Sequence, residues 1–169
     1  MPTTTTVQQE RWHEVVTDPT LRDCPHKVET NERGQLILTP HSNRHSDLQT
    51  RLLLLLREHA PTGPVAVEYA LATPQGVKVP DVVWMSPDRR AEMRDTGDPS
   101  TLAPELCVEI MSRSNTEDEL REKWALYREI GAEEVWIVDA DGRIRVFGEA
   151  EREGSEIAPS CPNRVDPTA

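Results

Sequence analysis

Branched aliphatic residues occupy every second position along residues 106–110. Leu106, Val108 and Ile110 fall on one side of this stretch, and Cys107 and Glu109 fall on the other. A period of two predicts a β-strand. Glu109 then has apolar neighbours before and after it, and a carboxylate in such surroundings needs a cation, a donor or water, because an unpaired buried charge is costly. Glu109 is therefore the first candidate for a functional residue.

Short apolar runs bounded by turn residues predict the other strands. They are expected as a hairpin over residues 27–39 that turns at Gly34, and as strands over residues 65–71, 77–85, 135–138 and 143–148. Asp141-Gly142 has the composition of a two-residue hairpin turn.

Three segments have helical character. A short helix is expected to end near Asp18-Pro19, and a leucine-rich helix to run from a Ser46-Asp47 cap to about His59. The leucines surround this second helix almost completely, which is typical of a buried helix. A third helix is expected to run to about Ile130, with Ser114 and Glu117 as a capping box and Gly131 as its end. Residues 86–103 lack periodicity and are expected to form a loop.

Composition and charge limit the classes of protein. The chain has 169 residues, a net charge of −11 and three widely spaced cysteines, which suit neither a disulfide framework nor a zinc site. A net negative charge of this size argues against a protein that coats nucleic acid non-specifically. No apolar run approaches the roughly 20 residues of a membrane span. The start of the chain lacks the charge and apolar regions of a signal peptide, so we expect a cytoplasmic protein without a membrane partner.

Three acids are expected within successive strands: Glu68, Asp81 and Glu109. A lone acid of this kind most often faces solvent. Three on neighbouring strands, about 4.8 Å apart, either share a proton or bind a divalent cation. The sequence therefore predicts that these three carboxylates hold Mg²⁺ or Mn²⁺.

A lysine is the fourth candidate. Lys123 falls inside the apolar stripe of its helix, so its ammonium is expected to reach the acids, where it would hold a water or stabilise phosphate charge. The alternative is a surface ion pair with Glu119, four residues earlier. Glu29 and His45 are expected to line the same cleft. Ser112 and Ser114 lack a partner histidine, so acyl transfer is poorly supported.

Several of these motifs, in this order, resemble the Uma-two family, whose members are described as restriction endonucleases of the PD-(D/E)XK superfamily. The residues that carry the resemblance are Val79-Pro80-Asp81-Val82-Val83, Ala103 to Ser112, Lys123, Tyr127, Gly131 and Val135 to Asp139. The similarity covers roughly residues 20 to 160. It implies an α/β (α+β) fold with a restriction-endonuclease-like mixed β-sheet flanked by helices, and metal-dependent cleavage of DNA.

The resemblance also implies roles for residues. Asp81 is the aspartate of the Pro-Asp motif and Glu109 the second acid, both holding the metal, with the Ile110 carbonyl as an extra ligand. The superfamily's lysine usually stands two residues after the second acid, where this chain has Met111. The family match for that lysine is Lys123. Two copies of such a nuclease often cut two strands, so a homodimer is expected by analogy.

Composition and periodicity divide the chain into three parts, and the middle part carries most of the resemblance. Residues 1–20 are expected to be a mobile N-terminal segment with a short helix, and residues 21–150 the nuclease-like domain. Residues 151–169 are expected to form a loosely attached tail that adds at most one edge strand.

Two alternatives stay open. A non-catalytic nuclease-fold module for binding or assembly fits the acidic charge and the missing Glu-x-Lys spacing. A hydrolase of small phosphodiesters tolerates an acidic surface better than a DNA enzyme does. A basic strip along the cleft, from Arg89, Arg90, Arg113 and Arg121, would favour nucleic acid.

Overall fold

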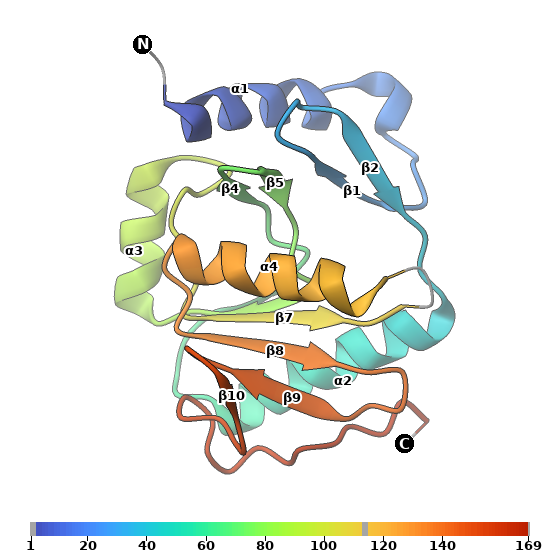
Figure 1. Ribbon diagram of the computed structural model, residues 1–169, viewed down its shortest axis with the longest axis vertical. Helices are drawn as coiled ribbons and strands as arrows, with labels where there is room; N and C mark the ends of the chain where they lie inside the picture. Colours follow the sequence, from blue (N-terminus) through green and yellow to red (C-terminus); the bar gives the residue numbers. More distant parts are fainter. Residues whose placement is uncertain (1–2, 113–114, 169) are drawn as a thin grey trace.

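The central element is a mixed β-sheet with helices on both faces (Figure 1). The computed structural model describes residues 3–112 and 115–168. Within these residues the main sheet has six strands, which in spatial order are β10 (Glu151–Arg152), β9 (Ile144–Phe147), β8 (Glu134–Val138), β7 (Leu106–Ile110), β6 (Val82–Trp84) and β3 (Val65–Val67). Only β7 and β8 pair in parallel, and the other neighbours are antiparallel. The predicted mixed sheet flanked by helices is confirmed.

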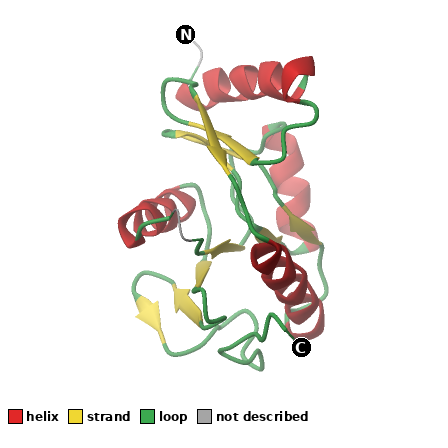
Figure 2. Cartoon of the chain, turned by 90° about the vertical axis from the view of Figure 1, so that its right-hand side faces the viewer, coloured by secondary structure: helices red, strands yellow, loops and turns green. Residues whose placement is uncertain are grey.

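The remaining elements surround this sheet. The helices are α1 (Thr4–Val16), a 3₁₀ turn (Pro19–Leu21), α2 (Asn43–His59), α3 (Pro87–Thr96) and α4 (Glu117–Glu129). Two hairpins lie outside the main sheet, β1 (Lys27–Thr30) with β2 (Leu36–Thr39), and β4 (Leu71–Thr73) with β5 (Gly76–Lys78). Figures 1 and 2 place α1 and the β1–β2 hairpin at one end of the molecule, far from the C-terminus.

The alternation in β7 distributes its residues between two cores. Leu106, Val108 and Ile110 pack with the leucines of α2 on one face. Cys107 faces the other side, where it packs with Tyr127 and other residues around α3 and α4. All five β7 residues are buried. Glu109 therefore lies on the α4 face, in an interior position, as its sequence pattern predicts.

The hairpins are attached to one another by polar contacts from β1. The Thr30 side chain accepts a hydrogen bond from Val77 N at 2.9 Å, and the Thr30 carbonyl accepts one from Lys78 Nζ at 2.9 Å. Gly76 has φ +103°, and a Cβ there would lie 2.3 Å from the Thr30 carbonyl oxygen, so only glycine fits this approach.

Two predicted strands are each divided in the structure. The strand expected over residues 65–71 ends at Val67, because Glu68 adopts a left-handed backbone with φ 50°. The strand expected over residues 77–85 is interrupted between Lys78 and Val82, where Pro80 offers no N–H for a ladder. Asp81 thus lies directly before β6 rather than within a strand.

The prediction of a loop over residues 86–103 was wrong, because α3 lies there. Ser86 caps this helix by accepting from Arg89 N, and Pro87 begins it. Met93 is its only buried residue, so the helix has no apolar period to detect. The cap of α4 also differs, since Thr116 and Glu119 form the capping box. The predicted cap, Ser114, lies outside the described residues.

Both ends of the described chain contact the rest of the fold. In α1, Gln9 donates to the carbonyls of Thr96 and Pro99, each at 2.8 Å. At the other end, β10 supplies the edge strand, and Ala158 is fully buried in the core on the α2 face. Glu134, itself buried, accepts hydrogen bonds from three groups of the C-terminal segment, namely Ser155 Oγ, Glu156 N and Ile157 N.

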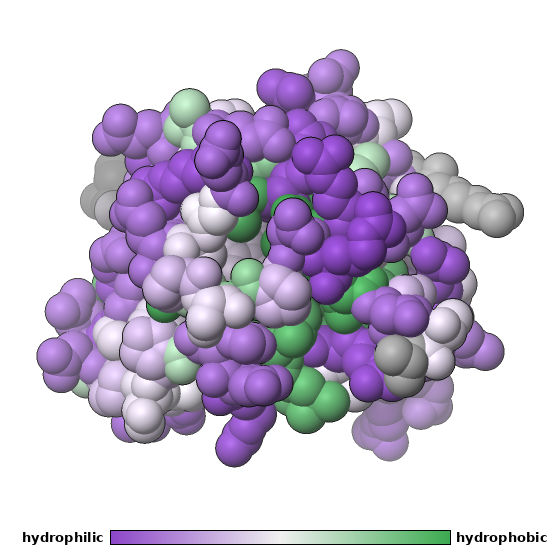
Figure 3. All heavy atoms as spheres, turned by 90° about the horizontal axis from the view of Figure 1, so that it is seen from below, coloured by the Kyte–Doolittle hydropathy of each residue, from purple (hydrophilic) through white to green (hydrophobic). Residues whose placement is uncertain are grey.

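The outer surface is mostly hydrophilic, with small apolar areas, when viewed from below (Figure 3). In the described part of the chain, no helix is long and apolar enough to span a membrane.

Candidate active site

Two buried acids meet where β6 and β7 lie side by side. Val82 pairs with Val108 in the sheet, so Asp81 and Glu109 come next to each other at the same end of the two strands. Asp81 is 0% exposed and Glu109 is 2% exposed. Asp81 is fixed because its Oδ2 accepts a hydrogen bond from Ile110 N at 2.8 Å and its carbonyl accepts one from Gln49 Nε2 at 2.9 Å. Ile110 thus contributes its N–H to the site.

A lysine that the sequence reasoning missed lies between these acids. Lys27 begins β1, and its Nζ is 3.1 Å from Asp81 Oδ1 and 3.5 Å from Glu109 Oε2. The same Nζ donates to the Val79 carbonyl at 3.0 Å. Lys27 and Glu29 share one face of β1 at a spacing of two residues, and this was the sequence signal that could have revealed it.

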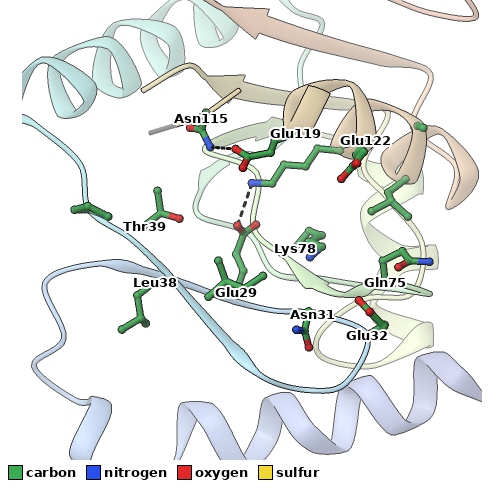
Figure 4. Close-up of a pocket in the computed structure, with 15 residues that line it drawn as sticks. Glu29, Asn31, Glu32, Leu38, Thr39, Gln75, Lys78, Asn115, Glu119 and Glu122 are labelled. Atoms are coloured by element: carbon green, nitrogen blue, oxygen red, sulfur yellow. Dashed lines mark hydrogen bonds and ion pairs between the residues drawn. The ribbon is translucent and has the colours of Figure 1, made fainter. Parts of the chain in front are cut away.

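Lys123 reaches the acids from α4. Its Nζ lies 3.0 Å from Glu29 Oε1 and 3.3 Å from Glu109 Oε1. The alternative partner, Glu119, instead completes the helix cap and contacts Asn115. Lys123 Nζ donates to Glu29 Oε1, and Figure 4 shows Glu119 turned to Asn115 instead.

Five of these side chains form an alternating series of charges. The order is Asp81, Lys27, Glu109, Lys123 and Glu29, with opposite charges adjacent throughout, and we call this series the charge chain. Two further hydrogen bonds are donated to carboxylate oxygens of the charge chain. Glu29 Oε2 accepts from Val79 N at 2.7 Å, and Glu109 Oε1 accepts from Tyr127 Oη at 2.6 Å.

Asp81 and Glu109 have pKa values that are displaced in opposite directions from the usual carboxyl range. Burial raises the pKa of Glu109 above its usual range, although Lys123 and Lys27 oppose the effect. Burial also acts to raise the pKa of Asp81, but Lys27 and hydrogen bonds from His45 and the Ile110 N–H outweigh it and hold the pKa below its usual range. Two neighbouring acids displaced in this way are typical of catalytic sites.

The other members of the charge chain are held in their charged forms. Burial favours neutral Glu29, yet Lys123, Lys27 and the Val79 N–H lower its pKa. Burial likewise disfavours the charged lysines, but the carboxylates, Glu109 first, raise the pKa of both Lys27 and Lys123.

His45, a predicted cleft residue, lies in the first turn of α2 beside Asp81. Its Nε2 is 3.3 Å from Asp81 Oδ1, and its ring stacks on His41 at a centroid distance of 4.9 Å. Its Nδ1 is buried and has no hydrogen-bond partner in the described part of the chain. Both predicted cleft residues, Glu29 and His45, are therefore at the site.

Glu68 is not brought to the other acids. Its side chain is exposed, and its carboxylate makes no hydrogen bond or ion pair with any described residue. Its backbone does contact the site, because Glu68 N donates to the Asp81 carbonyl at 3.1 Å. Glu68 lines a separate cleft, which Lys27 also lines.

The space around the charge chain is narrow at its centre and wide beside it. A cavity of about 10 Å³ lies directly over the site, covered by Thr39, Pro40 and His41. A larger cleft of about 790 Å³ opens beside Lys123 (Figure 4). Its ionisable lining residues are Glu29, Glu32, Lys78, Glu119, Glu122 and Lys123. The approach to the site is therefore more acidic than basic.

The donor set fits a hard divalent cation held by few protein ligands. No group of three or more His, Cys, Asp or Glu residues within the described ranges is arranged to hold a metal. Mg²⁺, however, usually takes one or two carboxylates and completes its shell with water and substrate phosphate. Asp81 and Glu109 supply two such carboxylates, and the Lys27 ammonium shows that their oxygens can share one cation.

The fold and the paired acids together define a restriction-endonuclease-like nuclease fold. A profile of the Uma2 family, described as "Putative restriction endonuclease", matches residues 19–162, and the chain belongs to this family. A structure similar to this chain is a crystal structure of a "putative nuclease belonging to DUF820" from Anabaena variabilis ATCC 29413. The two share 16% sequence identity with a TM-score of 0.56, over 72% of this chain and 71% of the other, a likeness that shows the fold. A search among curated proteins gave no match.

Proposed function

We propose that this protein is a metal-dependent endonuclease that hydrolyses phosphodiester bonds in DNA. Asp81 and Glu109 hold Mg²⁺ or Mn²⁺, and Lys123 assists. The observation that carries the proposal is that two buried carboxylates, one directly before β6 and one in β7, share one cation position, with a second ammonium 3.3 Å from Glu109. Membership of a family described as restriction endonucleases supports the nucleic-acid substrate.

Backbone and side-chain groups of the protein have separate roles in this mechanism. Asp81 and Glu109 would hold the divalent ion, which would supply polarisation of the phosphodiester and a lowered pKa for a water molecule. The Ile110 N–H orients Asp81, and the Tyr127 hydroxyl orients Glu109. Lys123 neutralises charge next to Glu109 and lines the acidic cleft, so its ammonium faces the side from which a substrate enters. Two strands require two such sites, which a homodimer would supply.

A hydrolase of small phosphodiesters is the second candidate, and the lining of the cleft favours it. Of the four arginines expected to form a basic strip, Arg89 donates to the carbonyls of Ala103 and Gly131, and Arg121 pairs with Glu117 at 3.6 Å. Neither these two nor Arg90 is among the residues that line the cleft beside Lys123. The fourth, Arg113, lies outside the described residues.

Calorimetric titration with Mn²⁺ tests the metal site. Wild type should bind Mn²⁺, and Asp81→Asn and Glu109→Gln should each lose that binding. Glu92→Gln on α3 is the matched control, because it removes one exposed acid away from the site and should bind as wild type does. Folded wild type that binds no Mn²⁺ would refute the proposal and favour a non-catalytic module.

Cleavage assays on the same samples decide the substrate. Supercoiled plasmid, single-stranded DNA, RNA and bis-p-nitrophenyl phosphate would be incubated with Mg²⁺ or Mn²⁺. Nicking or linearisation of plasmid that Asp81→Asn abolishes would support the endonuclease. Hydrolysis of the small diester alone would support the second candidate.

A further inference from the structure

The lysines of this chain are concentrated at one place. The sequence has sixteen arginines and three lysines, Lys27, Lys78 and Lys123. Lys27 and Lys123 belong to the charge chain, and Lys78 lines the cleft beside it. Arginine carries a wide planar charge, whereas lysine carries a compact ammonium on a flexible stem. A compact cation is what the space between two carboxylates accepts.

The Lys27 ammonium uses the oxygens that a divalent ion needs. All three of its described acceptors belong to this site, namely the Val79 carbonyl, Asp81 Oδ1 and Glu109 Oε2. A second cation bound to the same two carboxylates would meet the ammonium at short range in a buried setting, where like charges repel strongly. Lys27 and a divalent ion therefore compete for one position.

The structure provides a place for Lys27 to go. A second cleft of about 670 Å³ is also lined by this residue, and its other lining residues include the C-terminal end of α1 and the turn at Glu68. Lys27 and Glu68 both line it. Two acids line this cleft, Asp18 and Glu68. Asp18 accepts hydrogen bonds from Thr20, whereas the Glu68 carboxylate is exposed and has no partner among the described residues.

The backbone that carries Lys27 is not part of the main sheet. Lys27 is the first residue of β1, which pairs only with β2 within the described strands. Movement of its side chain therefore leaves the ladder that positions Asp81 and Glu109 intact.

We propose that Lys27 is a tethered counter-ion. It holds the position between Asp81 and Glu109 in the metal-free protein, and its ammonium moves to the Glu68 cleft when a divalent ion binds. This inference rests on the proposed function, because it assumes that the two acids take a divalent ion. It assigns Glu68 a role in metal binding without making it a ligand.

The first test compares Mn²⁺ affinity in Lys27→Met and wild type by calorimetry. Loss of the competing ammonium should tighten binding about tenfold or more, equivalent to about 1.4 kcal/mol. Arg121→Met is the matched control, since it removes one positive charge from an exposed side chain of α4 that pairs with Glu117 rather than with the acids of the site. This control should leave the affinity within about twofold of wild type.

A double-mutant cycle tests the role of Glu68. Glu68→Gln should weaken Mn²⁺ binding severalfold, because the displaced ammonium loses its new partner. The same change should have no effect in the Lys27→Met background. Glu92→Gln controls for the loss of one negative charge. An unchanged affinity in Glu68→Gln would overturn the assigned destination of Lys27.

A measurement on wild type covers the case in which Lys27→Met does not fold. Reductive methylation followed by peptide mass spectrometry reports the reactivity of all three lysines. Only 7% of the Lys27 side chain is exposed in this structure, so the ammonium is shielded while it lies between the two acids. Saturating Mg²⁺ should raise its methylation rate at least about fivefold relative to Lys78. An unchanged rate at saturation would overturn the inference.

The outcomes separate this inference from the proposed function. If wild type binds Mn²⁺ and Lys27→Met binds it equally or more weakly, the counter-ion role is wrong and the metal site stands. If neither folded protein binds Mn²⁺, the metal site is wrong and the counter-ion role fails with it.

Discussion

Replacing Lys123 by methionine is the sharpest test of the charge chain. The substitution keeps an unbranched side chain of similar length and removes the ammonium. That ammonium lies 3.0 Å from Glu29 Oε1 and 3.3 Å from Glu109 Oε1, and the two carboxylates are only 4% and 3% exposed. Lys123→Met therefore leaves two buried acids with fewer partners.

The cost can be worked out from these distances. At an effective dielectric constant of about 20, unit charges about 3 Å apart attract by roughly 5 kcal/mol. Removing the ammonium also removes its desolvation penalty, which amounts to several kcal/mol. Lys27 stays with Glu109, and the Val79 N–H stays with Glu29. The expected net loss is about 3 kcal/mol, the lower end for a broken buried pair.

Urea denaturation followed by circular dichroism measures this loss. Thermal unfolding should show a midpoint lower by roughly 6–12 °C for a chain of this size. Arg121→Met is the control, because Arg121 lies on the same helix and its side chain is 54% exposed beside Glu117. The control should unfold near the wild-type midpoint. A loss below about 1 kcal/mol in Lys123→Met would show that the two acids do not depend on this ammonium.

Three further predictions concern the site and its supports. Tyr127→Phe removes the 2.6 Å hydrogen bond to Glu109 and should cost about 1–3 kcal/mol in urea denaturation, and wild-type stability would contradict this. Glu134→Ala leaves three partly buried donors of the C-terminal segment without their acceptor, so amide exchange at Glu156 and Ile157 should accelerate. Retained protection would show that Glu134 is not the anchor. The lowered pKa values of Asp81 and Glu29 predict stabilisation that is present above the ordinary carboxyl pKa of about 4 and lost as the pH falls further. Acid titration of stability should therefore be shallower in Asp81→Asn than in wild type. The raised pKa of Glu109 acts with the opposite sign and partly offsets the slope.

The parts of the site that were predictable are those with local periodicity. The alternation around Glu109 predicts both its strand and its face, and the helical stripe of α4 predicts that Lys123 turns inward. Glu29 and His45 were expected near the cleft from their places beside the early hairpin and helix, and the structure puts both within the site.

The parts that were not predictable depend on how separate elements dock. The spacing of Lys27 and Glu29 in the sequence places them on one face of β1, but only the packing of the β1–β2 hairpin takes Lys27 to the Val79 carbonyl and the acids. The sequence predicts Glu68 within a strand beside the other acids. Its left-handed backbone instead ends that strand at Val67. In α3, a single buried residue gives no period from which a helix can be inferred.

The alternating order of the charge chain has an evolutionary consequence. Each member neutralises its neighbours, so the loss of any one leaves a buried opposite charge with fewer partners. Substitutions at positions 27, 29, 81, 109 and 123 should therefore be inherited together rather than singly. Within the family, a homologue that replaces Lys27 by a neutral residue should also have changed one of the acids or should depend on bound metal for its folding. Such pairs of changes would mark the lineages in which the site has been lost or rebuilt.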